Sequence, residues 1–185
     1  MSNQKPVITS IALESLSESI PVMLPEIAEF HKLNCMICFH KNGHTTGVGM
    51  DVNSLNQKTT ISISWMGEVT EQHLKSLQDE NKATDFAACA IALLLIRETS
   101  NFTAVEQSAT GTSIDYYLTE NGRSDDLIFN KSARLEVSGI LNASASNSIR
   151  SRINEKKRRL KRQDDFIDLI AIVEFGKPQS VIEKA

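Results

Sequence analysis

The sequence lacks the features that mark membrane, secreted and disulfide-stapled proteins. Its longest uncharged apolar run covers residues 86–96, whereas a helix that spans a bilayer needs about 20 apolar residues. Three cysteines, an odd number, provide no disulfide framework. The first residues show no basic region followed by an apolar stretch, so no secretory signal is recognisable. We therefore expect a cytoplasmic protein without a membrane segment.

The sequence also lacks internal repeats and any linker rich in proline or glycine. Hydrophobic residues make up 41% and charged residues 23% of the 185 positions, which is typical of a globular protein with a core. We expect a single domain over 1–185. Within it, residues 1–83 form an elaboration of one helix and a meander, and residues 84–175 form the core.

In the first part of the chain, apolar residues spaced by three and four predict a helix over 11–33. Pro21 and Pro25 must kink or divide that helix, because proline removes a backbone donor. Three segments that resemble strands follow, and we expect them to form an antiparallel meander. They cover residues 35–41, 48–52 and 59–65, and a short polar helix over 69–78 comes after them.

The second part begins with a strongly apolar helix over 84–98, capped by Thr84. Short strands, a polar turn, a loop of small residues and a basic helix follow. The expected strands are 104–109, 113–118, 133–140 and 166–175, with the turn at 120–126, the loop at 142–147 and the basic helix at 149–162. This order of elements predicts a mixed α/β fold, in which a central mixed sheet is flanked by helices.

Positive charge is concentrated in the predicted basic helix. Its eight cations are Arg150, Arg152, Lys156, Lys157, Arg158, Arg159, Lys161 and Arg162. With the single acid Glu155 the segment carries +7, so the rest of a chain of net charge −3 carries −10. Such a helix suits phosphate contacts with nucleic acid, although it has no aromatic residues on which bases would stack. Two alternatives are a solvated helix that faces acidic surface and a docking face for an acidic protein partner.

Two carboxylates occupy neighbouring predicted strands. Strand alternation places Asp115 on the same face as Ser113, and Glu136 on the same face as Ser138. A hairpin between the strands brings Asp115 and Glu136 to one surface. Buried acids need a partner, and a divalent cation that activates water for phosphodiester hydrolysis is a common one. The alternative is the ordinary solvent-facing side of a sheet, where acids are frequent.

At these residues the chain resembles the PD-(D/E)XK nuclease superfamily, which has the restriction-endonuclease-like fold. The resemblance covers residues 84–175 and rests on the order helix, strand, strand with Asp115, strand with Glu136, helix, strand. It implies that Asp115 and Glu136 bind Mg²⁺ or Mn²⁺, with Glu98 of the preceding helix as a further ligand. Ser138 stands where the superfamily motif has its lysine.

The resemblance also implies where the missing lysine is supplied. Some members of the superfamily move it to the following helix, which makes Lys156 or Lys157 the catalytic candidate, with Lys131 a weaker one. Gln107 and Glu174 also lie on strands from which they could reach the site. The segment 133–140, Ala-Arg-Leu-Glu-Val-Ser-Gly-Ile, is similar to a signature of small bacterial proteins. That similarity favours a bacterial setting, with phage defence as one expected context.

The pair Cys35 and Cys38, followed by His40 and His44, has a spacing that suggests zinc. On the strand predicted there, however, the two cysteines point to opposite faces and cannot hold one ion. We expect both to be buried structural residues.

The leading functional expectation is a metal-dependent nuclease-like protein that hydrolyses or binds nucleic acid phosphodiesters. The alternative is a catalytically inactive nuclease-fold subunit that docks a protein partner, and Ser138 favours it. A homodimer through an open edge of the meander is also compatible with the pattern. A third reading is an unrelated mixed fold whose acids decorate the surface.

Overall fold

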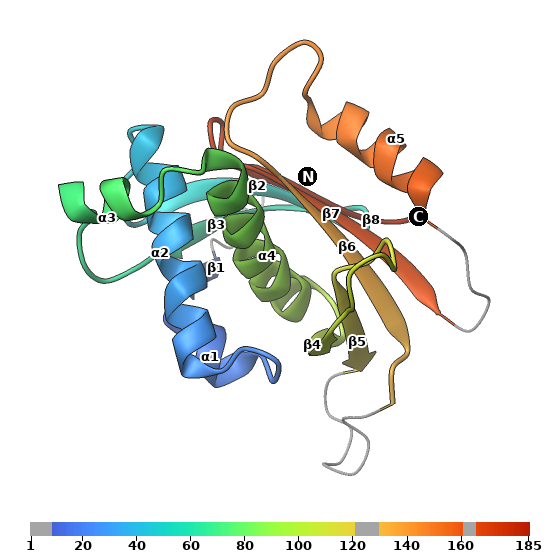
Figure 1. Cartoon of the computed structure of the whole chain (residues 1–185). Helices are drawn as coiled ribbons and strands as arrows, with labels where there is room; N and C mark the ends of the chain where they lie inside the picture. Colours follow the sequence, from blue (N-terminus) through green and yellow to red (C-terminus); the bar gives the residue numbers. More distant parts are fainter. Residues whose placement is uncertain (1–8, 121–129, 161–165) are drawn as a thin grey trace, which may run out of the picture.

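A computed structural model describes residues 9–120, 130–160 and 166–185, and in these residues the chain forms one mixed sheet flanked by helices (Figure 1). The mixed α/β class predicted from the sequence is confirmed. The strands are β1 Thr9–Ala12, β2 Val48–Ser54, β3 Gln57–Ser64, β4 Phe102–Gln107, β5 Tyr116–Glu120, β6 Ala133–Ile140, β7 Ile167–Glu174 and β8 Gln179–Lys184. The helices in the described residues are α1 Ser15–Ser19, α2 Pro25–Lys41, α3 Glu71–Ser76, α4 Glu80–Thr99 and α5 Ile149–Arg159.

The eight strands form one sheet in the order β1-β3-β2-β8-β7-β6-β5-β4. The pairs β1/β3, β2/β8 and β6/β7 are parallel, and the other neighbours are antiparallel. β8 lies between β2 and β7, so it joins the strands from the two halves of the chain into a single sheet. The part of the chain expected to be an N-terminal elaboration therefore shares its sheet with the expected core.

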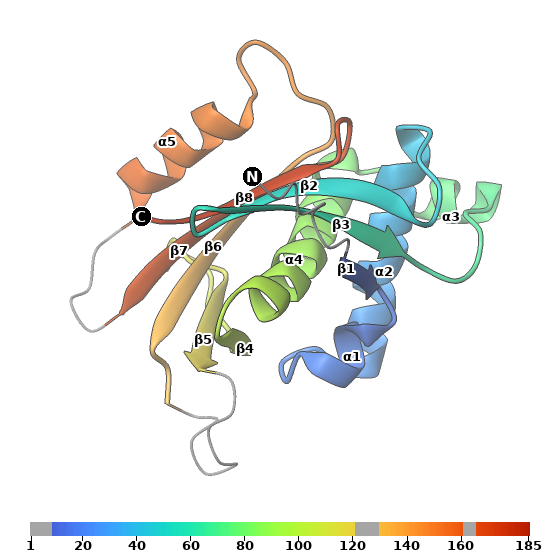
Figure 2. The same cartoon turned by 180° about the vertical axis from the view of Figure 1, so that it is seen from behind.

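Helices cover the two faces of the sheet unequally (Figures 1 and 2). Alternate residues of β6 and β7 divide between two apolar clusters, as the period of two in a strand requires. Val137 and Ala171 belong to the large core cluster together with the apolar run of α4, whereas Ile140 and Ile172 pack with Ile153 of α5. α2 and α4 therefore lie on one face, and α5 lies alone on the other.

Several expected elements are present, and β6 has the bounds that alternation predicted. The predicted apolar helix 84–98 lies within α4, which begins earlier because Asp79, and not Thr84, caps it by accepting from the N–H of Lys82 at 3.2 Å. The expected turn over 120–126 falls almost entirely outside the described residues. No helix in the described parts of the chain is both long enough and apolar enough to span a bilayer.

The largest correction concerns residues 35–41, which form the second half of helix α2 and not a strand. Pro25 starts that helix at a position where its missing N–H is not needed. The run is apolar on almost every side because it packs against α4 in the core, so its periodicity carries no helical signature. The expected helix over 11–33 is likewise divided, with its first residues in β1 and α1.

The antiparallel meander is also wrong in part. Of its three expected strands, only β2 and β3 are present, as a hairpin. In the described residues β1 pairs with Ile61–Ser64 of β3 and β8 pairs with Asp51–Ser54 of β2, so each edge of the hairpin is covered in part. β8 was not expected from the sequence at all.

Gly139 of β6 allows α4 to lie directly on the sheet. A Cβ atom at this position would come within 2.5 Å of the carbonyl oxygen of Thr84, 2.6 Å of its Cγ2 and 3.0 Å of the Cβ of Ala88. Two turns of α4 therefore touch the backbone of β6 where a side chain has no room. This contact fixes the separation of helix and strand one residue beyond Ser138.

We predict that Gly139→Ala lowers the free energy of unfolding by roughly 1–3 kcal/mol, because the added methyl group forces α4 away from β6. Urea denaturation measures the effect. Gly49→Ala is the matched control, since a Cβ there meets only Thr60 Cγ2 at 3.6 Å, and its expected change is within about 1 kcal/mol. Equal effects of the two substitutions would contradict the assigned contact.

Candidate carboxylate–lysine site

Helix α5 is attached to the sheet by Ile153, by the partly buried Ile149 and by two ion pairs. Ile153 is its buried residue and packs against the isoleucines of β6 and β7. On one side the Nζ of Lys156 donates a hydrogen bond to Oε1 of Glu136 on β6. On the other side Lys157 Nζ lies 2.7 Å from Oε1 of Glu183 on β8. Successive lysines of one helix thus bind acids on opposite sides of the helix axis.

Asp115 lies next to Glu136, as strand alternation predicted. Its backbone N–H donates to the carbonyl of Leu135 at 2.8 Å, and its Oδ2 accepts from the N–H of Val137 at 2.7 Å. β5 itself begins only at Tyr116, so the carboxylate of Asp115 replaces the strand partner that Val137 would otherwise need. This contact holds the Asp115 carboxyl against β6, where it also interacts with the carboxyl of Glu136.

Glu136 is the electrostatic centre of the site. Its side chain lies beneath α5, with the residue 9% exposed. Burial raises the pKa of Glu136 to about 7, the neighbouring negative charge of Asp115 adds to the increase, and the ammonium of Lys156 opposes it. The Glu136 carboxyl therefore titrates near neutral pH, and a second cation placed beside it would favour its ionised form.

Asp85 is a third carboxylate close to this pair, and the sequence analysis missed it. It lies in the second turn of α4 and lines a cleft of about 320 Å³ together with Thr84, Gly139 and Arg152. Partial burial raises the pKa of Asp85, as does the charge of Asp115, whereas the charges of Lys156 and Arg152 lower it. These influences mean that Asp85 faces the same group of charges as Glu136. The cleft opens between the start of α4, the end of β6 and the start of α5.

Cys89 lies one helical turn after Asp85 and is half-buried beside the same acids. Burial raises the pKa of its thiol, and so do the charges of Asp115 and Glu136. Its side chain also shares a hydrogen bond with Tyr116. The signal that could have found both α4 residues is their spacing of four, which puts a carboxylate and a thiol on one stripe of an otherwise apolar helix.

The structure does not bring Glu98 to the pair, although the resemblance assigned it as a ligand. Glu98 is exposed near the opposite end of α4, and 13 residues of helix separate it from Asp85, which is about 20 Å along the axis. Gln107 is exposed on the edge strand β4. Lys131 is bound to Glu106 at 2.7 Å and lies over the ring of Tyr117.

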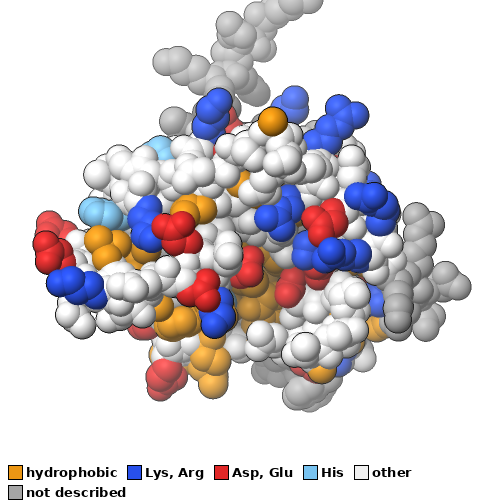
Figure 3. Space-filling model, turned by 45° about the horizontal axis from the view of Figure 1, so that its top comes forward, with side chains coloured by type: hydrophobic (Ala, Val, Ile, Leu, Met, Phe, Trp, Pro, Cys, Tyr) orange, Lys and Arg blue, Asp and Glu red, His pale blue; other side chains and the backbone are white. Residues whose placement is uncertain are grey.

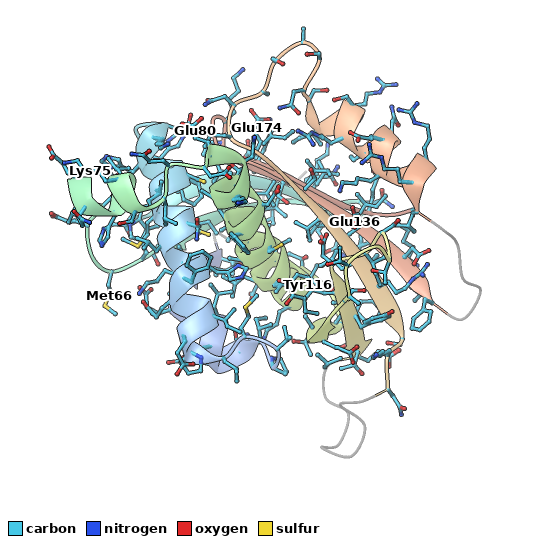
Figure 4. All side chains as sticks on the ribbon, in the orientation of Figure 1. Met66, Lys75, Glu80, Tyr116, Glu136 and Glu174 are labelled. Atoms are coloured by element: carbon cyan, nitrogen blue, oxygen red, sulfur yellow. The ribbon has the colours of Figure 1, made fainter. Side chains whose placement is uncertain are left out.

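Ser138 and Glu174 point to the same face of the sheet as Glu136 but are further along it. Ser138 is the next residue of β6 on that face and is buried. Glu174 is opposite Ile140 in the parallel pair of β6 and β7, and its Oε2 accepts from Nε2 of Gln179 at 2.6 Å. Glu174 is also buried. Its level in the sheet is four residues of strand, about 13 Å, from that of Glu136. Figure 4 shows Glu136 below α5 and Glu174 near the β7–β8 turn.

The predicted basic helix carries its cations around most of its circumference. On the face of the molecule drawn in Figure 3, Lys and Arg side chains gather on the side of α5, next to acidic side chains near the centre. Arg152 donates from Nε to Oδ1 of Asn147 at 2.8 Å, and Arg159 pairs with Glu155 at 2.8 Å. Arg150 and Arg158 are exposed and form no ion pair with a described residue. Lys161 and Arg162 lie outside the described residues.

No set of three or more His, Cys, Asp or Glu side chains in the described parts of the chain is arranged to hold a metal ion. At the carboxylate pair, the Lys156 ammonium supplies the positive charge. Cys35 and Cys38 are buried between α2 and α4, as expected, where their thiols face Ala87 O at 3.3 Å and Thr84 Oγ1 at 3.9 Å. They pack as core residues.

Comparison with models of protein families, with curated proteins and with solved structures gave no match to this chain. The chemistry of the site is therefore the basis for a functional assignment. Asp115 and Glu136 lie together with Lys156, and Asp85 and Arg152 line the neighbouring cleft within reach of their charges. Carboxylate oxygens suit hard divalent cations, whereas lysine and arginine suit phosphate.

The raised pKa of Glu136 predicts a specific dependence of stability on pH. Because the folded chain binds this proton more tightly than the unfolded chain, the contribution is present below pH 4.5 and is lost as the pH rises through about 7. Relative to wild type, Glu136→Gln should therefore gain stability between pH 5 and 7.5, by on the order of 1–3 kcal/mol. Urea denaturation at several pH values in EDTA measures the difference.

Glu98→Gln is the matched control for this series, since it removes an exposed carboxylate from the far end of α4. Its stability relative to wild type should stay constant across the same pH range. A Glu136→Gln curve parallel to that of wild type would show that burial does not raise the pKa of Glu136.

Proposed function

We propose that residues 84–175 form a restriction-endonuclease-like core and that the protein hydrolyses phosphodiester bonds of nucleic acid with Mg²⁺ or Mn²⁺. The arrangement of α4, β4, β5, β6, α5 and β7 supports this proposal, with β5 and β6 antiparallel and β6 and β7 parallel. The observation that carries it is the contact of Lys156 with Glu136 beside Asp115. That contact supplies, from α5, the lysine that position 138 lacks.

Asp115 and Glu136 would hold the cation, with Asp85 across the cleft in place of Glu98. Carboxylate oxygens are the ligands that Mg²⁺ and Mn²⁺ prefer. Burial and the nearby Asp115 raise the pKa of Glu136, so a bound cation would favour its ionised form. A bound divalent cation would supply activation of water and stabilisation of charge on the phosphate. Lys156 must then move away from Glu136 by a small displacement of its side chain or of α5.

Lys156 and Arg152 have separate tasks in this mechanism. Once displaced from Glu136, the Lys156 ammonium remains near the reacting group and can orient the attacking water or donate a proton to the leaving oxygen. Arg152 lines the cleft beside Asp85 and presents a planar group that suits a non-bridging phosphate oxygen. Lys157 is tied to Glu183 on the other side of α5 and takes no part.

The second candidate function is a catalytically silent nuclease-fold subunit that binds a protein partner. One observation favours it: the Lys156 ammonium already neutralises Glu136 without a metal ion, while Ser138 occupies the motif position. In that case the exposed cations of α5 form the docking face for an acidic surface. The two functions differ in their response to divalent cations.

The direct test is cleavage of labelled single- and double-stranded DNA and RNA with Mg²⁺ or Mn²⁺, compared with EDTA. We expect metal-dependent cleavage that falls about 100-fold or more in Glu136→Gln and Asp115→Asn, because each removes a ligand of the cation that stabilises the transition state. Lys156→Met should lower the rate by a comparable factor through loss of acid–base assistance. Mn²⁺ should also raise the melting temperature of wild type but not of Asp115→Asn, since a ligand bound only by the folded state stabilises it.

Glu98→Gln should retain full cleavage, because that side chain is remote from the pair. Loss of activity in this variant would show that the metal ligands are not those named above. Absence of cleavage by wild type, together with a melting temperature that Mn²⁺ leaves unchanged, would rule out the nuclease and favour the silent binding subunit.

A further inference from the structure

A second groove lies on the other side of α5 from the carboxylate pair. It has a volume of about 870 Å³ and runs between α5 and the hairpin of β7 and β8. Its apolar lining includes Ile149, Ile153 and Val181. The rest of the lining is mostly polar or charged, so the groove combines an apolar floor with many polar groups. A concave site of this size can hold a small molecule or one unit of a polymer. The nuclease proposal makes no use of it.

A buried carboxylate lies at the end of this groove. Glu174 is 3% exposed, and Gln179 of the neighbouring strand holds its Oε2 through Nε2 at 2.6 Å. Both residues line the groove. Figure 4 shows Glu174 near the turn between β7 and β8, well apart from Glu136. A carboxylate held in this way, beside apolar side chains, presents a hydrogen-bond acceptor to whatever enters the groove.

The rim of the groove carries exposed cations. Arg150 projects from the first turn of α5 and Lys177 from the β7–β8 turn, and both line the groove. Neither forms an ion pair with a described residue. Lys157 also lines the groove and is bound to Glu183. The groove thus has two cations without an ion pair on its rim and a buried carboxylate in its lining. This combination suits a ligand with anionic groups at the rim and a hydrogen-bond donor that enters the groove.

We infer that this groove binds one nucleotide of a single-stranded nucleic acid and favours a base with an amino group. The base would lie against Ile149 and Val181, its amino group would donate to Glu174, and the flanking phosphates would contact Arg150 and Lys177. Carboxylates accept hydrogen bonds from the N4 amino group of cytosine, whereas thymine presents a carbonyl oxygen at that position. This inference rests on the proposed function insofar as both require a nucleic acid ligand.

The test compares two pyrimidine strands that differ at the group read by Glu174. Fluorescence anisotropy in EDTA gives the affinity of fluorescein-labelled dodecamers of deoxycytidine and of thymidine, without cleavage. Wild type should bind the cytidine strand roughly tenfold more tightly, the discrimination that one good base contact provides. Glu174→Gln should bind both strands equally, since an amide offers a donor as well as an acceptor.

Arg150→Ala tests the phosphate contact at a position where the fold is not at risk. It should weaken binding of both strands by roughly three- to tenfold and reduce the salt dependence of log Kd by about one phosphate contact. Arg97→Ala is the matched control, because Arg97 is exposed at the far end of α4. Binding by Arg97→Ala should equal that of wild type, and thermal denaturation checks that Glu174→Gln is folded.

Equal affinities of wild type for the two strands, or equal effects of Arg150→Ala and Arg97→Ala, would overturn the groove as a nucleotide site. The cleavage assay is separate and decides the nuclease alone. Cleavage with equal affinities would reject the groove and keep the nuclease. A cytidine preference lost in Glu174→Gln, without cleavage, would reject the nuclease and support the groove.

Discussion

The burial of Glu136 is the constraint on which the arrangement of the site depends. A carboxyl group beneath a helix, next to a second carboxyl, is unfavourable unless a cation reaches it. Lys156 supplies that cation from α5. The same contact, together with the buried Ile153, binds α5 to the sheet. The position of α5, the two grooves on its sides and the charge state of Glu136 are therefore determined together.

The sequence predicted the part of the site that follows from strand periodicity. Alternation placed Asp115 and Glu136 on one face of adjacent strands, and the contact of Asp115 with Val137 confirms that they are neighbours. The sequence also named Lys156 and Lys157 as equal candidates. It could not separate them, because the choice depends on where Ile153 sits on the sheet, and no local pattern reports that position.

The parts that sequence reasoning predicted wrongly or missed have a common physical cause: tertiary packing overrides the local sequence pattern. Residues 35–39 are all apolar and buried where α2 packs against α4, so their composition resembles that of a buried strand. β8 is stabilised mainly by its neighbours β2 and β7. The resemblance named Glu98 as the helical acid, and Asp85 was not considered, because the end of α4 that crosses β6 is set by Gly139, a contact between distant segments.

The contact at Gly139 gives the carboxylate cleft one rigid wall and one compliant wall. α4 touches the backbone of β6 and cannot move closer or slide without a clash, so Asp85 keeps its height above the sheet. α5, by contrast, is held by two isoleucines, Ile149 and Ile153, and by two ion pairs. Any ion or phosphate that enters the cleft must be accommodated on the α5 side. One wall of the cleft is therefore set by backbone contact, and the other by the side-chain contacts of α5.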